Sequence, residues 1–172
     1  IRRKSTVDRA LNLTPRTLAT NDGTVMPWKL GDYLLLERLN QGGMADVYLA
    51  KTFGFSGADQ TVAVKCIRPE VSEDPTFVRM FIDEAKLAAQ LNHNNIIHIY
   101  DLGKIENDFY IAMEFVDGRD LRTILNYARR EQQPLPMGLA LMIAAGLADG
   151  LKHAHHRRDF ENRELGLVHR DV

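Results

Sequence analysis

Lys65 lies in a segment that otherwise has the composition of a buried strand. Residues 61–67 read Thr-Val-Ala-Val-Lys-Cys-Ile, which is β-branched and alternating and predicts a strand. Along such a strand Val62, Val64 and Cys66 point to one side, and the lysine points to the other. A lysine in an apolar strand either extends its ammonium group to solvent or meets an anion. An anion would make this a binding site, whereas an edge strand with a solvated lysine would not.

Glu84 is a second charged residue on an apolar surface. Residues 75–91 predict a helix, and Glu84 lies one turn after Phe81 and one turn before Ala88 on the same stripe. An unpaired carboxylate on a core-facing stripe is costly, so we expect it to pair with Lys65. The alternative is a carboxylate at the edge of the stripe that reaches solvent.

Two adjacent glycines, Gly42 and Gly43, separate predicted strands at residues 33–39 and 46–51. Because glycine has no Cβ, the backbone amides of such a turn can approach a phosphate group closely. A glycine pair between strands is also a common hairpin turn. Taken alone, the turn leaves both a phosphate-binding loop and a plain hairpin open.

The sequence closes with the tripeptide His-Arg-Asp at residues 169–171, after a long apolar helix predicted at residues 137–155. The tripeptide is uninformative by itself. It follows the glycine turn, the strand lysine and the helix glutamate, and the order of these four features together is specific.

From about residue 30 to residue 172, the chain resembles the N-terminal half of a protein kinase domain of the bacterial eukaryotic-like (Hanks-type) serine/threonine class. Six segments carry the resemblance: residues 42–48 for the glycine-rich loop, 62–65 for the strand with the ATP lysine, Glu84 for the helix-C glutamate, 91–97 for the segment after that helix, 110–118 for the last strand and hinge, and 169–172 for the start of the catalytic loop.

The resemblance implies a set of catalytic residues. Lys65 would hold the α- and β-phosphates of ATP and would be oriented by Glu84. Asp171 would accept the proton of the substrate hydroxyl group as it attacks the γ-phosphate. His169 and Arg170 would support the loop, and the arginine could contact a phosphate on the activation loop. The implied cofactors are ATP and Mg²⁺, and the implied partner is a protein with serine or threonine acceptors.

The resemblance also implies an adenine site. Val47 and Ala63 would cover the ring from above, Met113 would be the gatekeeper, and the backbone of Glu114 and Val116 would bind the adenine edge. The implied nucleotide-binding residues are Leu39, Asn40, Gly42, Gly43, Val47, Ala63, Lys65, Met113, Glu114, Val116 and, for the ribose, Asp120.

These residues need a framework of strands followed by helices. Further strands are predicted at residues 96–102 and 109–115, and a further helix at residues 121–130. The order predicts an α+β, protein-kinase-like fold with an antiparallel five-stranded N-lobe and its helix C. The first helices of a truncated helical C-lobe would follow. The helix at residues 137–155 is strongly apolar, which predicts that it is buried.

The domain boundaries follow changes in composition along the chain. Residues 1–28 are polar and predict a poorly ordered leader or linker. Residues 29–116 would form the ATP-binding N-lobe. Residues 117–172 would form the hinge and the start of a C-lobe that is truncated at the catalytic loop.

Some parts of the family pattern are missing. The usual three-glycine loop would have glycines at Asn40 and Ala45, so we expect altered loop closure with nucleotide binding retained. The catalytic-loop asparagine, the magnesium-binding Asp-Phe-Gly segment and the activation loop would follow Val172, so no metal ligand is assigned here. We therefore expect weak nucleotide binding and no transfer by this chain alone. Uncovered helices would favour aggregation, self-association or a partner.

Composition sets outer limits on function. Hydrophobic residues make up 45% and charged residues 26%, and the net charge is -1, which favours neither nucleic acid nor a membrane surface as partner. No apolar run is long enough to span a bilayer. The single cysteine, Cys66, fits a reducing compartment and hence a cytoplasmic location. We expect it to be core rather than a reactive thiol.

Three function classes remain open from the sequence. An active protein kinase is favoured by Lys65, Glu84 and Asp171 together. A pseudokinase or scaffold that binds nucleotide or partners without catalysis would keep the same fold. A small-molecule phosphotransferase is the third class, and the arginine before Asp171 favours a protein kinase over it.

Overall fold

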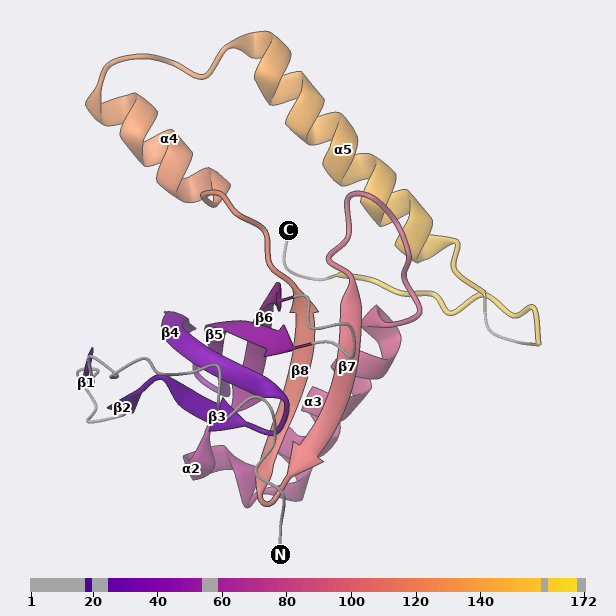
Figure 1. The fold of residues 1–172 in the computed structure, drawn as a ribbon. Helices are drawn as coiled ribbons and strands as arrows, with labels where there is room; N and C mark the ends of the chain where they lie inside the picture. Colours follow the sequence, from indigo (N-terminus) through magenta and orange to yellow (C-terminus); the bar gives the residue numbers. More distant parts are fainter. Residues whose placement is uncertain (1–17, 20–24, 54–58, 159–160, 170–172) are drawn as a thin grey trace, which may run out of the picture.

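The computed structural model describes residues 18–19, 25–53, 59–158 and 161–169, and its main feature is one antiparallel sheet (Figure 1). Six strands pair in the order β3-β4-β5-β6-β8-β7. Their bounds are β3 Trp28–Leu30, β4 Tyr33–Gln41, β5 Ala45–Phe53, β6 Asp59–Ile67, β7 Ile99–Ile105 and β8 Asp108–Glu114. A separate pair, β1 Leu18–Ala19 and β2 Val25–Met26, precedes them.

Four helices accompany the sheet: α2 Pro69–Ser72, α3 Pro75–Ala88, α4 Leu121–Arg130 and α5 Met137–His155. The α3 helix begins as the sequence predicts, because the Asp74 side chain accepts a hydrogen bond from the Thr76 amide at 2.8 Å and Pro75 fills the first turn. It ends at Ala88 rather than at residue 91. The predicted bounds of α4 and α5 are confirmed.

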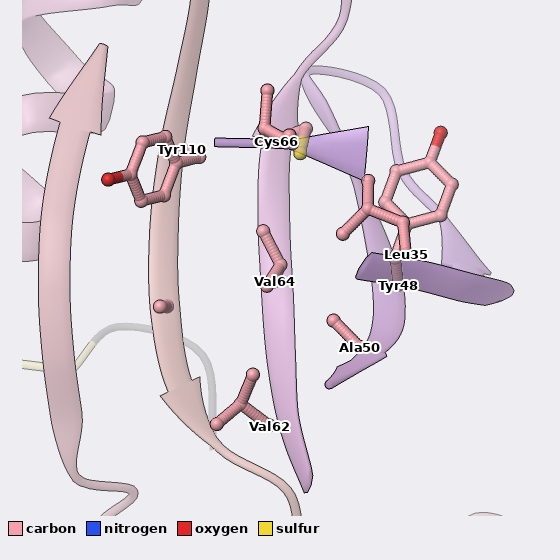
Figure 2. Close-up of a cluster of buried hydrophobic side chains, with 9 residues drawn as sticks. Leu35, Tyr48, Ala50, Val62, Val64, Cys66 and Tyr110 are labelled. Atoms are coloured by element: carbon pink, nitrogen blue, oxygen red, sulfur yellow. The ribbon is translucent and has the colours of Figure 1, made fainter. Parts of the chain in front are cut away.

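The two faces of the sheet bury different clusters. One face carries Val62, Val64 and Cys66 of β6 together with residues of the neighbouring strands, as Figure 2 shows. The opposite face packs against α3 through Phe81 and Ala85. The alternation predicted along β6 is therefore correct, and it leaves Lys65 on the α3 side. The Lys65 side chain therefore lies beside α3 and not in the cluster around Val64 on the other face of the sheet.

The predicted strands need correction in number and in bounds, and β4, β5 and β6 are each longer than predicted by one or two residues at one or both ends. The sheet has six strands instead of five, because Trp28–Leu30 pairs with the start of β4. β7 begins at Ile99 rather than at residue 96, because a turn closes before it with the Ile96 amide donating to the His93 carbonyl at 3.0 Å. β8 lies one residue earlier than predicted. Most of the predicted leader, residues 1–17 and 20–24, lies outside the described residues.

The prediction that residues 137–155 form a buried helix is wrong. Only Gly150 of α5 is buried, close to the backbone of Asn95, whereas Leu141 and Met142 are 63% and 64% exposed. Figure 1 shows α4 and α5 extending away from the sheet. Apolar periodicity indicates that a helix has something to pack on, and no other described element covers most of this one.

We expect this exposed apolar surface to drive self-association of the chain. Replacing Leu141 and Met142 together by glutamine should weaken association by about tenfold or more, because each buried side chain of this size contributes about 1.5–3 kcal/mol. Sedimentation velocity over a concentration series measures the monomer fraction. Lys152→Gln on the same helix is the control. A parent chain that is monodisperse and melts cooperatively as a monomer would contradict the expectation.

Candidate functional site

The structure contains the predicted ion pair between Lys65 and Glu84. The lysine comes from β6, opposite Val47 of β5 and Ile111 of β8, and its Nζ lies 2.7 Å from Oε1 of Glu84 on α3. The carboxylate side chain is 54% exposed and the lysine side chain 24% exposed. Exposed ion pairs contribute only about 0–1 kcal/mol to stability, so this pair adds little to the stability of the fold. The pair instead holds the ammonium group of the lysine at a fixed place.

Phe81 also positions Lys65, a role that the sequence reading missed. Its ring centroid lies 5.8 Å from Nζ, within the range of a cation–π contact. Phe81 is almost fully buried, one helical turn before Glu84. Helical spacing alone could have indicated this, because a side chain one turn from the glutamate faces the same strand. The ammonium group is therefore held by a carboxylate and an aromatic ring.

The glycine turn between β4 and β5 is tightly closed at Gly42. Its amide donates to the Ala45 carbonyl at 3.0 Å, and the Met44 carbonyl accepts from the Arg68 amide at 2.9 Å. A Cβ on Gly42 would lie 2.7 Å from the Ala45 carbonyl oxygen, a distance that real Cβ atoms do not show. Gly43 has open space where its Cβ would be. The first glycine is required by the turn, and the second leaves its backbone accessible.

This difference gives a paired prediction. Gly42→Ala should lower the free energy of unfolding by about 1–3 kcal/mol, because the backbone of the turn must shift. Gly43→Ala should change it by less than about 0.5 kcal/mol. Urea denaturation of both variants measures the difference. Equal effects of the two substitutions would show that the turn does not depend on a close approach at Gly42.

A cleft of about 420 Å³ joins the turn, the ion pair and the inner strands. Seven predicted site residues line it: Asn40, Gly42, Gly43, Val47, Lys65, Glu84 and Met113. Six further lining residues were not predicted: Met44, Ala45, Ala85, Ala88, Ile99 and Ile111. The cleft thus combines glycine amides and one ammonium group with apolar walls. This is suited to a ligand with an anionic end and a flat apolar end.

The other predicted nucleotide-binding residues lie outside this lining. Ala63 is buried and pairs across the sheet with Met113. Leu39 is 42% exposed. The Glu114 amide donates to the His98 carbonyl at 2.8 Å, so only its carbonyl could contact a base edge. Val116 is exposed in the segment that follows β8.

Asp120 has a local partner in the structure. As the N-cap of α4, its carboxylate accepts hydrogen bonds from the Thr123 hydroxyl group at 2.7 Å and from the Thr123 amide at 2.8 Å. These two bonds, the hydroxyl bond first, hold the pKa of Asp120 below its usual range. The carboxylate is fully exposed, so it still has free acceptor positions toward a ligand.

The predicted catalytic end of the chain is described only in part. His169 is exposed. Arg170 and Asp171 lie outside the described residues, so their roles stay predictions. Within the part of the chain that is described, no three histidine, cysteine, aspartate or glutamate side chains form a group that could hold a metal ion. None of the described helices has the length and apolarity needed to cross a membrane.

An antiparallel lobe, one helix and a lysine–glutamate pair beside a glycine turn define the class of nucleotide-binding phosphotransferase lobes. Comparison with known proteins gives the family. The protein kinase domain family matches residues 33–172. The chain belongs to the protein kinase family, and its fold is the kinase N-lobe with part of the C-lobe, which confirms the sequence prediction.

Bacterial proteins are among its relatives. It is 40% identical over 142 residues to the tyrosine-protein kinase MasK of Myxococcus xanthus, a match covering 83% of this chain and 22% of that protein. It is 36% identical over 142 residues to the serine/threonine-protein kinase PrkC of Bacillus subtilis, with 83% and 20% covered. The crystal structure of a cysteine-to-alanine mutant of the Mycobacterium tuberculosis PknI kinase domain superposes with a TM-score of 0.64 at 33% identity. That match covers 85% of this chain and 54% of the PknI chain. The chain spans about a fifth of the length of MasK and of PrkC.

Proposed function

We propose that this chain is the ATP-binding part of a serine/threonine protein kinase, whose parent transfers the γ-phosphate of ATP to serine or threonine residues of proteins. The observation that carries the proposal is the 2.7 Å pair between Lys65 and Glu84, which lines one cleft together with the glycine turn. A fixed ammonium group beside the accessible backbone of Gly43 suits a triphosphate, because phosphoryl transfer depends on positioning and on charge stabilisation.

Each end of the nucleotide has suitable residues. The Gly43 amide would cover the phosphates, because the Gly42 amide already donates to the Ala45 carbonyl, and Lys65 would bind the phosphate oxygens. Val47 and Met113 offer apolar surface to the adenine ring, and Ile111 also lines the cleft. The Glu114 carbonyl and the Val116 amide would bind its polar edge, and Asp120 the ribose. Mg²⁺ would supply further charge neutralisation when bound, and we assign it no ligand among the described residues.

Hydroxyl-group specificity is the finer part of the proposal. PrkC is named a serine/threonine kinase, and its name supports serine/threonine specificity. MasK is named a tyrosine kinase, so the names of the relatives do not agree on the acceptor residue. The test uses a protein extended through the rest of the kinase domain, labelled ATP, magnesium and a generic protein substrate. Hydrolysis and phosphoamino-acid analysis should yield labelled phosphoserine or phosphothreonine. Label on tyrosine alone would overturn the specificity.

A pseudokinase or scaffold is the second candidate. The observation that favours it is the glycine turn, where Asn40 and Ala45 stand at positions that are usually glycine. Ala45 is buried in the α3-side cluster and also lines the cleft, so its methyl group occupies space beside the nucleotide site. Nucleotide binding without transfer in the extended protein would favour this candidate. Transfer by the 172-residue chain alone would contradict our proposal that this chain binds nucleotide weakly and is inactive.

A further inference from the structure

A second pocket, of about 400 Å³, lies on the sheet face opposite α3. Two of its lining residues, Tyr48 and Cys66, belong to the buried cluster of that face (Figure 2). The other lining residues come from five strands and from the start of α2: Trp28, Gln41, Asp46, Ile67, Arg68, Pro69, Glu70 and Asp108. The pocket shares Asp46 and Tyr48 with the glycine-rich segment, but none of its lining residues lines the cleft of the candidate ATP site. Its polar groups therefore need their own account.

Asp46 is the group that calls for a ligand. The residue is only 8% exposed, and its Oδ1 has no hydrogen-bond donor among the described residues. Its other oxygen, Oδ2, lies 3.6 Å from Nη1 of Arg38, which is an ion pair but too long for a hydrogen bond. A buried carboxyl oxygen without a donor is costly and rare. Asp46 lines the pocket and 12% of its side chain is exposed, so a donor bound in the pocket lies next to its carboxyl group.

The surroundings favour a positively charged ligand. Asp108 contributes a second carboxyl group, to which no described side chain donates a hydrogen bond. Glu70 is a third, already paired with Nη2 of Arg68 at 3.2 Å. Trp28 and Tyr48 meet edge to face, with ring centroids 6.3 Å apart and planes at 88°. Carboxyl groups beside aromatic rings are the environment that binds organic cations.

Cys66 does not change this assignment. Burial first, and then the charges of Asp108 and Asp46, raise the pKa of its thiol to about 12, so it stays neutral. A neutral, buried thiol is neither a nucleophile nor a metal ligand. Nor do the acidic residues here belong to any metal-holding group in the described part of the chain. An organic cation is left as the ligand class.

We propose that this pocket binds the guanidinium group of an arginine side chain presented by a partner protein. A guanidinium group is planar, can stack on an aromatic ring, and has five donors for Asp46 and Asp108. An ammonium group is a compact, strongly hydrated charge that uses the aromatic walls less well. Free arginine adds an α-carboxylate that the acidic lining repels and an α-ammonium group that it attracts, whereas an arginine within a peptide chain adds neither charge.

Arg68 connects this pocket to the glycine turn. Its side chain lines the pocket, while its Nη1 donates to the Gly42 carbonyl at 3.4 Å and its amide donates to the Met44 carbonyl. A bound guanidinium group competes with Arg68 for Glu70 and for the local negative charge. Occupancy is therefore coupled to the turn, and by reciprocity to any ligand of the cleft. The proposed coupling between this pocket and the cleft, the regulatory half of the proposal, rests on the proposed function. The binding of a guanidinium group in the pocket does not.

Trp28 makes the test direct, because it is the only tryptophan of the chain. Its fluorescence is titrated in the 172-residue chain with N-acetyl-arginine amide, and with the neutral isostere N-acetyl-citrulline amide. We expect a saturable change with the first and at least about tenfold weaker binding of the second, the effect of losing a charge-assisted hydrogen bond. Butylamine and free arginine should also bind less tightly than the arginine amide. If citrulline amide or butylamine bound as tightly as the arginine amide, the assignment of a guanidinium site would be refuted. If free arginine bound more tightly than the arginine amide, the proposal that the ligand belongs to a partner protein would be refuted.

Two variants locate the site. Asp108→Asn should weaken binding of the arginine amide by about tenfold, and Glu131→Gln, an acidic residue on the α4 side, should leave it unchanged. An equal loss in both variants would mean a general charge effect and would overturn the assignment. The affinity for ADP is then measured with and without saturating arginine amide. A shift supports the coupling through Arg68, and an unchanged ADP affinity beside a saturable fluorescence change would refute the regulatory half alone.

Discussion

Replacing Lys65 by methionine is expected to lower phosphate transfer by about 10²–10³-fold in the protein extended through the rest of the kinase domain. The substitution keeps a long apolar side chain on β6 but removes the only ammonium group that lines the described cleft. Loss of one preorganised charge at the transferring phosphate costs about this much. Glu84→Gln should cost less, because the lysine remains charged and Phe81 still contacts it.

Lys51→Met is the matched control for this prediction. Lys51 lies on β5 of the same sheet, pairs with Asp59 at 3.4 Å between exposed side chains, and does not line the cleft. Its removal changes the net charge by the same amount, and we expect transfer to change by less than twofold, since surface pairs contribute about 0–1 kcal/mol. Initial rates at saturating ATP separate loss of transfer from loss of binding. Comparable rates for Lys65→Met and the parent would refute the assigned role.

The elements that could be predicted are those with a strong local signal. α4 and α5 match their predicted bounds because apolar periodicity, proline and charged ends agree there. α3 begins at Pro75 because the Asp74 cap is a local interaction. The short strand Trp28–Leu30 could not be predicted, because three residues carry no periodicity and only their pairing with β4 makes them a strand.

In the candidate site, too, local sequence features could be predicted and contacts between distant segments could not. The contact between Lys65 and Glu84 could be expected from two charges on apolar surfaces, because each needed a partner. How deeply Glu84 lies was left open, since a helical stripe gives direction and not burial, and the carboxylate pairs with Lys65 while its side chain stays 54% exposed. The aromatic contact of Phe81 and the pocket around Asp46 depend on where strands far apart in sequence meet. No local pattern carries that information.

The exposure of α5 could not be predicted from its sequence for a different reason. Its apolar sequence predicts burial, yet the described chain offers it only the loop around Asn95 as a neighbour, and most of the helix is exposed. The chain covers about half of the PknI kinase domain that it resembles. We therefore interpret the apolar face of α5 as a surface that requires covering. Sequence patterns report what a segment needs and not whether the rest of the structure supplies it.

Replacing Asp171 by asparagine is expected to lower phosphate transfer by about 10²–10⁴-fold while leaving nucleotide affinity within about twofold. Asp171 lies outside the described residues, and its role as the base for the substrate hydroxyl group is a proposal that rests on the resemblance of residues 169–171 to the His-Arg-Asp motif of the family. General base catalysis contributes about this factor. Asparagine keeps the shape but cannot accept the proton, so rate and binding should separate.

The separation between rate and binding is what distinguishes Asp171 from Lys65. Lys65 contacts the nucleotide cleft, so its loss is expected to affect both ATP affinity and transfer, whereas a base that contacts only the acceptor affects transfer alone. Titration with a fluorescent ATP analogue and initial-rate measurements on the same preparation test this. Asp59→Asn, an exposed aspartate on β6, is the control with the same chemical change. If Asp171→Asn retained full transfer, the acceptor hydroxyl group would need another base, and the active-kinase assignment would lose its catalytic residue.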